Sequence, residues 1–234
     1  MIGEMNSIER EVAASLLGWW VEAGVDAPVA EEPRDWLGRR PPPIAQAIAP
    51  PPAPERPADL DAFRQWLVSA PGLPMDRGVS VRVAPNGPAE APVMLMSDLP
   101  DRADAADRQP IGGEAYALAV RMLAAIGIEA GNAYHASLSC FHAPGARIGR
   151  DDLEACAGIA RDHIRLAKPK RLVLFGDAPS RALLGEPLAR ARGRVHRVEG
   201  IRTIATFHPR WLLQRPADKA LAWRDLLLLM SESD

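Results

Sequence analysis

Four short apolar runs between residues 93 and 206, each followed by a helical pattern, constrain the possible fold most strongly. These runs cover 93–96, 133–138, 171–175 and 201–206. Residues 93–96 (VMLM) and 171–175 (RLVLF) are the apolar segments typical of strands buried on both faces. Strands that alternate with helices form parallel sheets with helices on both faces. The sequence therefore predicts a three-layer α/β/α sandwich around a central, mostly parallel four-stranded sheet.

Prolines divide the chain before this pattern begins. Eight prolines between residues 41 and 57 exclude regular helix or sheet there, which predicts an extended, proline-rich linker over 40–57. Upstream, apolar residues recur at three- and four-residue spacing over 3–24, which predicts a helix. We therefore expect an N-terminal helical appendage over 1–39, the linker, and a main domain over 58–234.

The formal net charge of −2 carries no overall signature of nucleic-acid binding. Residues 181–215 nevertheless hold eight arginines against only Glu186 and Glu199. This arginine-rich segment suits a phosphate-rich partner. The alternative is a solvated basic surface without a binding role.

Cysteine occurs only at positions 140 and 156, which fits a reducing compartment and not a disulfide framework. The first residues lack a basic region followed by an apolar stretch, so we expect no secretion signal. No apolar run approaches the length needed to span a membrane. The sequence thus predicts a cytoplasmic protein.

The segment 201–216 (IRTIATFHPRWLLQRP) places a histidine where a strand gives way to a helix. Ligands bind at this edge of open α/β sheets. His208 could there donate a hydrogen bond to a developing anion or transfer a proton near neutral pH. The alternative is a histidine that only caps a turn, with Pro209 in the first turn of the helix.

Several ordered motifs together resemble the uracil-DNA glycosylase superfamily, and most closely its family 4, the iron–sulfur branch. They are 107–113 (DRQPIGG), 121–127 (RMLAAIG), 168–176 (KPKRLVLFG), 206–213 (TFHPRWLL) and 223–226 (WRDL). The resemblance extends over roughly residues 93–228 and leaves out the N-terminal helix and linker. It implies a DNA-repair enzyme that hydrolyses the N-glycosidic bond of a flipped-out deaminated base, uracil or a related one.

The resemblance also implies roles for individual residues. His208 would stabilise the departing base, and Asp98 would position a water and balance the positive charge on the sugar. The residues expected to contact the base are Pro100, Ile111 and Ser137. The residues expected to contact DNA are Gly112, Arg192, Arg194, Pro209 and Arg210.

The sequence departs from the family pattern at three of these positions and at Asp101. Asp98 stands in place of a glutamate, Asp101 of a glycine, Ile111 of an aromatic residue and Ser137 of an asparagine. A serine has a shorter arm than the asparagine that reads the base edge, so base selectivity changes. One alternative is therefore a catalytically lapsed glycosylase fold that binds DNA or a repair partner. Another, an unrelated small-molecule hydrolase, explains the strand–helix alternation but not the ordered motifs.

The ligand set for an iron–sulfur cluster is incomplete. Cys140 and Cys156 match one pair of family ligands, but no cysteines occur near residues 69–73, where the other pair is expected. A [4Fe–4S] cluster usually takes four cysteine ligands. We therefore expect no metal and no cofactor, with apolar packing in place of the cluster; the alternative is a mixed site that includes His135, His142 or His163. DNA is the expected partner of a monomer, with a repair protein possible at the N-terminal helix or linker.

Overall fold

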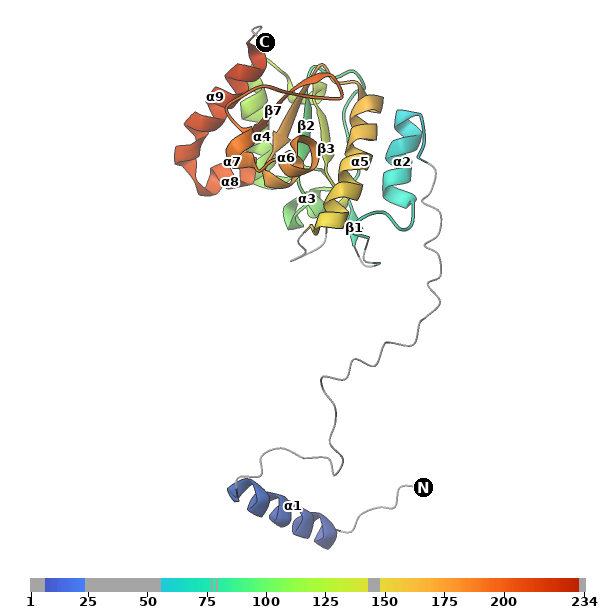
Figure 1. Ribbon diagram of the computed structural model, residues 1–234, viewed down its shortest axis with the longest axis vertical. Coiled ribbons are helices and arrows are strands. Elements are labelled where there is room, and N and C mark those ends of the chain that lie inside the picture. The colour runs from blue at the N-terminus through green and yellow to red at the C-terminus, as the bar shows by residue number, and fades with distance from the viewer. Residues whose placement is uncertain (1–6, 24–55, 77, 79, 143–147, 232–234) are drawn as a thin grey trace. The chain divides into compact units, whose positions relative to one another are not determined.

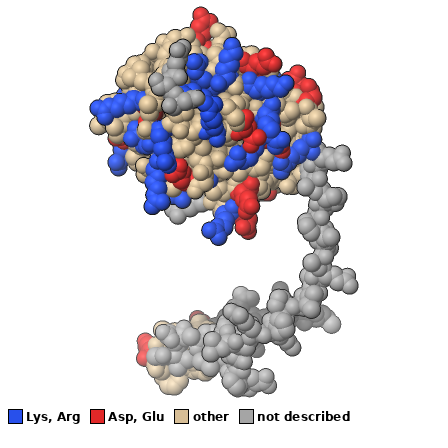
Figure 2. Space-filling model, turned by 45° about the horizontal axis from the view of Figure 1, so that its top comes forward, with Lys and Arg blue, Asp and Glu red and all other residues tan. Residues whose placement is uncertain are grey.

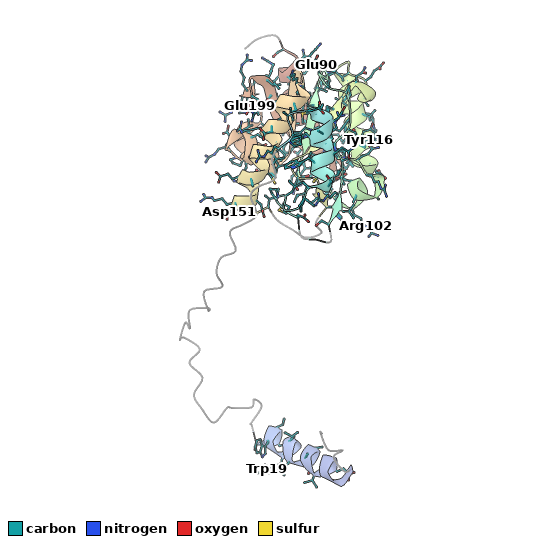
Figure 3. All side chains as sticks on the ribbon, turned by 90° about the vertical axis from the view of Figure 1, so that its right-hand side faces the viewer. Trp19, Glu90, Arg102, Tyr116, Asp151 and Glu199 are labelled. Atoms are coloured by element: carbon teal, nitrogen blue, oxygen red, sulfur yellow. The ribbon has the colours of Figure 1, made fainter. Side chains whose placement is uncertain are left out.

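The computed structural model describes residues 7–23, 56–76, 78, 80–142 and 148–231. Contacts along the chain separate two compact units, 1–51 and 52–234. In the first unit, helix α1 spans Ser7–Glu22, within the helix predicted for 3–24. Several of its large apolar side chains are exposed, and Figure 3 shows Trp19 standing out from the helix. Most of the proline-rich segment lies outside the described residues, so its role as a linker stays a prediction.

The second unit is built on a five-stranded sheet in the order β3-β2-β5-β7-β6. Its strands are β2 (Met94–Ser97), β3 (Tyr134–Ser137), β5 (Arg171–Phe175), β6 (His196–Val198) and β7 (Ile201–Thr206). The first four in this order run parallel, as the sequence predicts, whereas β6 pairs antiparallel with β7. The fifth strand arises because Glu199 and Gly200, both at positive φ, make a tight turn.

Helices cover both faces of the sheet, so the predicted three-layer architecture is confirmed (Figure 1). Side chains alternate along β2: Met94 and Met96 pack in one core and Leu95 in the other. The helices of the first core are α2 (Leu60–Ser69), α5 (Arg150–Ala167), α6 (Asp177–Leu184) and α7 (Leu188–Ala191). Those of the second core are α4 (Gly113–Ala125) and α9 (Lys219–Met230).

The remaining elements are short. They are β1 (Val81–Arg82), α3 (Arg102–Asp107), η1 (Ala130–Asn132), β4 (Phe141–His142), α8 (Pro209–Gln214) and η2 (Pro216–Asp218). Strands β1 and β4 form a separate antiparallel pair. No helix among the described residues is long and apolar enough to cross a membrane.

Residues 101–110 have no apolar run, yet they contain α3 because Asp101 and Asp104 form a reciprocal capping box at its start. This helix brings two carboxylates to the edge where β2 ends. Helix α5 begins after Gly149 without a side-chain cap, and Asp151 and Asp152 lie in its first turn.

Candidate active site

The carboxyl ends of three neighbouring parallel strands meet at one cavity of about 720 Å³. Asp98 follows β2, Gly176 follows β5, and Phe207 and His208 follow β7. Binding sites of open parallel sheets form at this edge. The structure therefore brings the two predicted catalytic residues, Asp98 and His208, to the wall of one cavity.

His208 is held in one orientation and one protonation state. It is the N-cap residue of α8, and its Nδ1 accepts the backbone N–H of Arg210 at 3.1 Å. An accepting Nδ1 carries no proton, so the ring proton of the neutral imidazole lies on Nε2, which is 3.2 Å from Nη2 of Arg210. His208 is 5% exposed, and burial together with the Arg210 guanidinium holds its pKa well below its usual range. His208 is thus a neutral imidazole at the cavity, with nitrogen atoms of Arg210 close to both of its ring nitrogens.

Asp98 faces His208 across the site. Its Oδ1 lies 4.0 Å from Nε2 of His208, and 38% of its side chain is exposed. Burial raises the pKa of Asp98 to about 6, although the Arg210 guanidinium acts to lower it. At neutral pH this carboxylate is mostly ionised and close enough to the cavity to bind a water.

Arg210 occupies the space between these two residues. Its guanidinium contacts carboxylate oxygens of Asp98 at 2.9 Å, Asp101 at 3.0 Å and Asp104 at 3.3 Å. The charge of Arg210 is therefore already neutralised within the protein. A DNA phosphate, the contact predicted for Arg210, would have to compete with three carboxylates.

Asp104 connects this charge cluster to the start of α4. It is fully buried and accepts the backbone N–H groups of Asp101 at 2.8 Å and Gly112 at 2.6 Å. A Cβ at Gly112 would lie 2.8 Å from the carbonyl oxygen of Ala103, so only glycine allows this approach. The sequence analysis missed Asp104, although the spacing of Asp101 and Asp104 before an alanine-rich segment is that of a capping box.

The three residues predicted to contact the base lie apart from this cavity. Ile111 is fully buried in the α4–α9 core, so its side chain offers no surface to a ligand. The Ser137 hydroxyl lies 3.3 Å from that of Ser97, and Pro100 is buried with its carbonyl accepting Nδ1 of His142 at 2.8 Å. Contact of these three residues with a base therefore stays a prediction.

The arginine-rich segment is paired internally to a large extent. Arg192 contacts the buried Asp225 at 2.9 Å and its guanidinium lies over the Phe207 ring. Arg194 forms an ion pair with Glu186. Figure 2 shows basic side chains spread over the visible face of the larger unit with acidic ones among them. Pro209 is buried as the first residue of α8 and serves the helix start.

The two cysteines supply at most half of the ligands that an iron–sulfur cluster usually takes. Both are buried, and burial raises the pKa of Cys140 and of Cys156 to about 12, so both thiols are protonated near neutral pH. The Cys140 thiol donates to the Leu67 carbonyl oxygen at 3.1 Å, and both cysteines line a cavity of only about 20 Å³. Among the described residues, no group of three or more His, Cys, Asp or Glu side chains is placed to hold a metal ion.

Comparisons with known proteins agree with this geometry. The family model described as "Uracil DNA glycosylase superfamily" matches residues 84–227, which include all of the strands and helices around the cavity. A type-4 uracil-DNA glycosylase of Pyrobaculum aerophilum is 23% identical over 181 residues, which covers 73% of this chain and 92% of the relative. The residues that the family model matches exclude α1.

Proposed function

Because this chain belongs to the uracil-DNA glycosylase superfamily, we propose that it hydrolyses the N-glycosidic bond of uracil, or a related deaminated base, flipped out of DNA. The family and its type-4 relative indicate a DNA glycosylase acting in base-excision repair. The observation that carries the finer proposal is the neutral, buried His208 beside Asp98 in one cavity. A base must leave the helical stack to reach these side chains.

His208 acts on the leaving base. As the glycosidic bond breaks, negative charge develops on the base, and Nε2–H of His208 donates a hydrogen bond to its oxygen. A neutral donor strengthens this bond as charge develops and thus favours the transition state over bound substrate. Since the Arg210 backbone N–H occupies Nδ1, the ring cannot turn to present its other nitrogen without losing that bond.

Asp98 acts on the sugar side of the same bond. Its ionised carboxylate binds the attacking water and balances the positive charge that the sugar acquires. The water then gives its oxygen to C1′ and its proton to the carboxylate. The pKa of about 6 keeps Asp98 charged at neutral pH and leaves it basic enough to accept that proton.

A catalytically lapsed protein that binds DNA or a repair partner is the second candidate. Ile111 favours it, because a fully buried side chain cannot stack on a flipped base. The exposed apolar side chains of α1, among them Trp19 and Leu17, favour a protein partner for that helix. This candidate retains DNA binding through the same domain but releases no base.

A release assay distinguishes the two candidates. Single- and double-stranded oligonucleotides that contain uracil, hypoxanthine or xanthine are incubated with the full chain at concentrations where binding is measured. We expect free base and abasic sites in equal amounts for at least one substrate. Binding without release from all of them would favour the lapsed protein.

We also propose that apolar packing takes the place of the cluster, since two buried, protonated thiols supply at most half of its ligands. Anaerobically prepared protein should contain far less than one iron per chain and show no visible absorbance band. Stoichiometric iron with such a band would contradict this, and its loss in Cys140→Ser would identify the ligand.

For DNA binding we propose Arg215 as a phosphate contact beside the cavity. Its guanidinium lies 4.6 Å from the centre of the Trp211 ring, which lines the cavity, and no described carboxylate pairs with it. Arg215→Ala should weaken binding to all sequences and reduce the salt dependence of log K by about one unit of slope. Arg165→Ala, at an arginine paired with Asp162 and Glu199, is the control and should leave the slope unchanged. Equal salt-dependence slopes for both variants would show that Arg215 does not contact a DNA phosphate.

A further inference from the structure

We propose that Arg210 is a positioning residue, which holds the Asp98 carboxylate charged and aimed at the cavity, and that it is not a ligand for DNA phosphate. This rests on the proposed function, because it assigns Arg210 a part in the glycosylase reaction through Asp98. The role expected from the arginine-rich segment, a phosphate contact, is the competing one.

The geometry of the guanidinium carries the proposal. Nη2 donates to Oδ1 of Asp98 at 2.9 Å, and Nη1 lies 3.0 Å from Oδ2 of Asp101. Nη2 is also 3.3 Å from Oδ2 of the fully buried Asp104. Only 26% of the Arg210 side chain is exposed, so its charged end faces inward. A guanidinium whose charge and N–H donors are already paired with three carboxylates binds an external anion weakly.

The same residue also contacts the catalytic histidine. The backbone N–H of Arg210 donates to Nδ1 of His208 at 3.1 Å, and its Nε lies 3.3 Å from the same atom. Nη2 of Arg210 also lies 3.2 Å from Nε2 of His208. One residue therefore contacts the imidazole through its backbone and its side chain, and the carboxylate through that same side chain. Asp98 and His208 keep their relative positions, with Oδ1 and Nε2 at 4.0 Å, because both are bound to Arg210.

Asp101 explains why a carboxylate can occupy this edge. Asp101 occupies the position at which the family motif has a glycine. An unpaired negative charge at this position would repel a DNA phosphate. In the structure Asp101 instead caps α3 and pairs with Arg210. The two charges neutralise each other, so the additional acid and Arg210 form one unit.

The charged groups around Asp98 determine how the loss of Arg210 would change its protonation. Asp101 and Asp104 of the α3 segment face it, Asp177 of α6 lines the same cavity, and His208 is neutral. His142 is bound to the Pro100 carbonyl oxygen. Arg210 is the cation in direct contact with Asp98. Its removal leaves the carboxylates of Asp98, Asp101 and Asp104 close together without that cation, and their mutual repulsion favours protonation of Asp98.

A titration of Asp98 tests the proposal without requiring activity. The full chain is labelled with ¹³C at aspartate carboxyl groups, and the Asp98 resonance is identified by its loss in Asp98→Asn. In the unmodified protein we expect a midpoint near pH 6. In Arg210→Gln the midpoint should rise by about 1–3 pH units, the usual effect of an adjacent opposite charge. Arg210→Lys keeps the positive charge but loses the planar guanidinium that contacts several carboxylates at once. The Asp98 midpoint should therefore rise less in this variant.

Arg165→Gln is the matched control. Arg165 is also paired with two carboxylates, but it lies in the last turn of α5 and does not line the cavity. This control should leave the Asp98 midpoint unchanged. An unchanged midpoint in a folded Arg210→Gln protein would overturn the proposal. If that variant does not fold, an unchanged midpoint in Arg210→Lys together with a lowered salt slope for DNA binding would also overturn it.

The pH dependence of base release gives a second readout. Release needs charged Asp98, so the rate falls as pH falls through its pKa, and this acid limb should move to higher pH in Arg210→Gln. DNA affinity and its salt slope should stay close to those of the unmodified protein. A slope reduced by about one with an unmoved acid limb would assign Arg210 to phosphate instead. If no base is released at all, the proposed function fails while the titration still decides the role of Arg210.

Discussion

His208→Ala should lower the single-turnover rate of base release about 10²–10³-fold while DNA affinity changes only a few-fold. Removal of a donor aimed at a developing anion costs about 3–4 kcal/mol of transition-state stabilisation. The hydrogen bond strengthens only as the base acquires charge, so its loss appears in the chemical step and not in binding. Rapid-quench measurements with protein in excess over uracil-containing duplex give the rate directly.

The capping role of His208 requires a matched control. Because Nδ1 caps α8, alanine also removes a helix cap, which costs about 1 kcal/mol of stability. His208→Asn restores a good capping residue but does not extend an N–H to the position of Nε2. We expect His208→Asn to fold like the unmodified protein and to remain as slow as alanine. If His208→Asn instead released the base as fast as the unmodified protein, His208 would act only as a helix cap.

Asp225→Ala should lower the free energy of unfolding of the full chain by about 3–5 kcal/mol, the cost of breaking a buried ion pair. Asp225 is 1% exposed and accepts from Arg192 at 2.9 Å, Thr206 at 2.7 Å and the Gly193 backbone N–H at 3.1 Å. Its removal leaves a half-buried guanidinium and a buried hydroxyl without their acceptor. Urea unfolding followed by circular dichroism measures the difference.

Asp61→Ala is the control for this prediction. Asp61 also pairs with an arginine, Arg64 at 3.0 Å, but 85% of its side chain is exposed. Exposed pairs contribute about 0–1 kcal/mol, so this variant should unfold almost as the unmodified protein does. A similar decrease in the free energy of unfolding for both variants would show that burial of Asp225 does not strengthen its contribution. Since Thr206 lies two residues before His208, Asp225→Ala should also slow base release even where the protein remains folded.

The strands and layers could be predicted because buried positions recur as a regular pattern of apolar residues in the sequence. Residues 172–175 are apolar because β5 lies in the middle of the sheet, with β2 and β7 on its two sides. The edge strand β6 lies outside the four apolar runs, since a half-exposed three-residue strand carries little pattern. Helix α3 was missed because its stability comes from a capping box and not from an apolar stripe.

The site could be predicted in part for a similar reason. Asp98 and His208 each follow a buried strand, and the strand ends of a parallel sheet meet at one edge. The partners of the arginines could not be predicted, because ion pairs such as Arg192–Asp225 join residues far apart in the sequence. Ile111 was placed at the base by motif position alone, and its burial depends on how α3 and α4 pack.

The most direct test of the account is the release of uracil by the unmodified chain and by Asp98→Asn, measured on one uracil-containing duplex. Asparagine keeps the size of the side chain but removes its charge and basicity. We predict that the unmodified chain yields free uracil and abasic sites in equal amounts, and that Asp98→Asn binds the same DNA but releases little uracil. The contradicting result is equal release by both proteins, or DNA binding by the unmodified chain with no release of uracil.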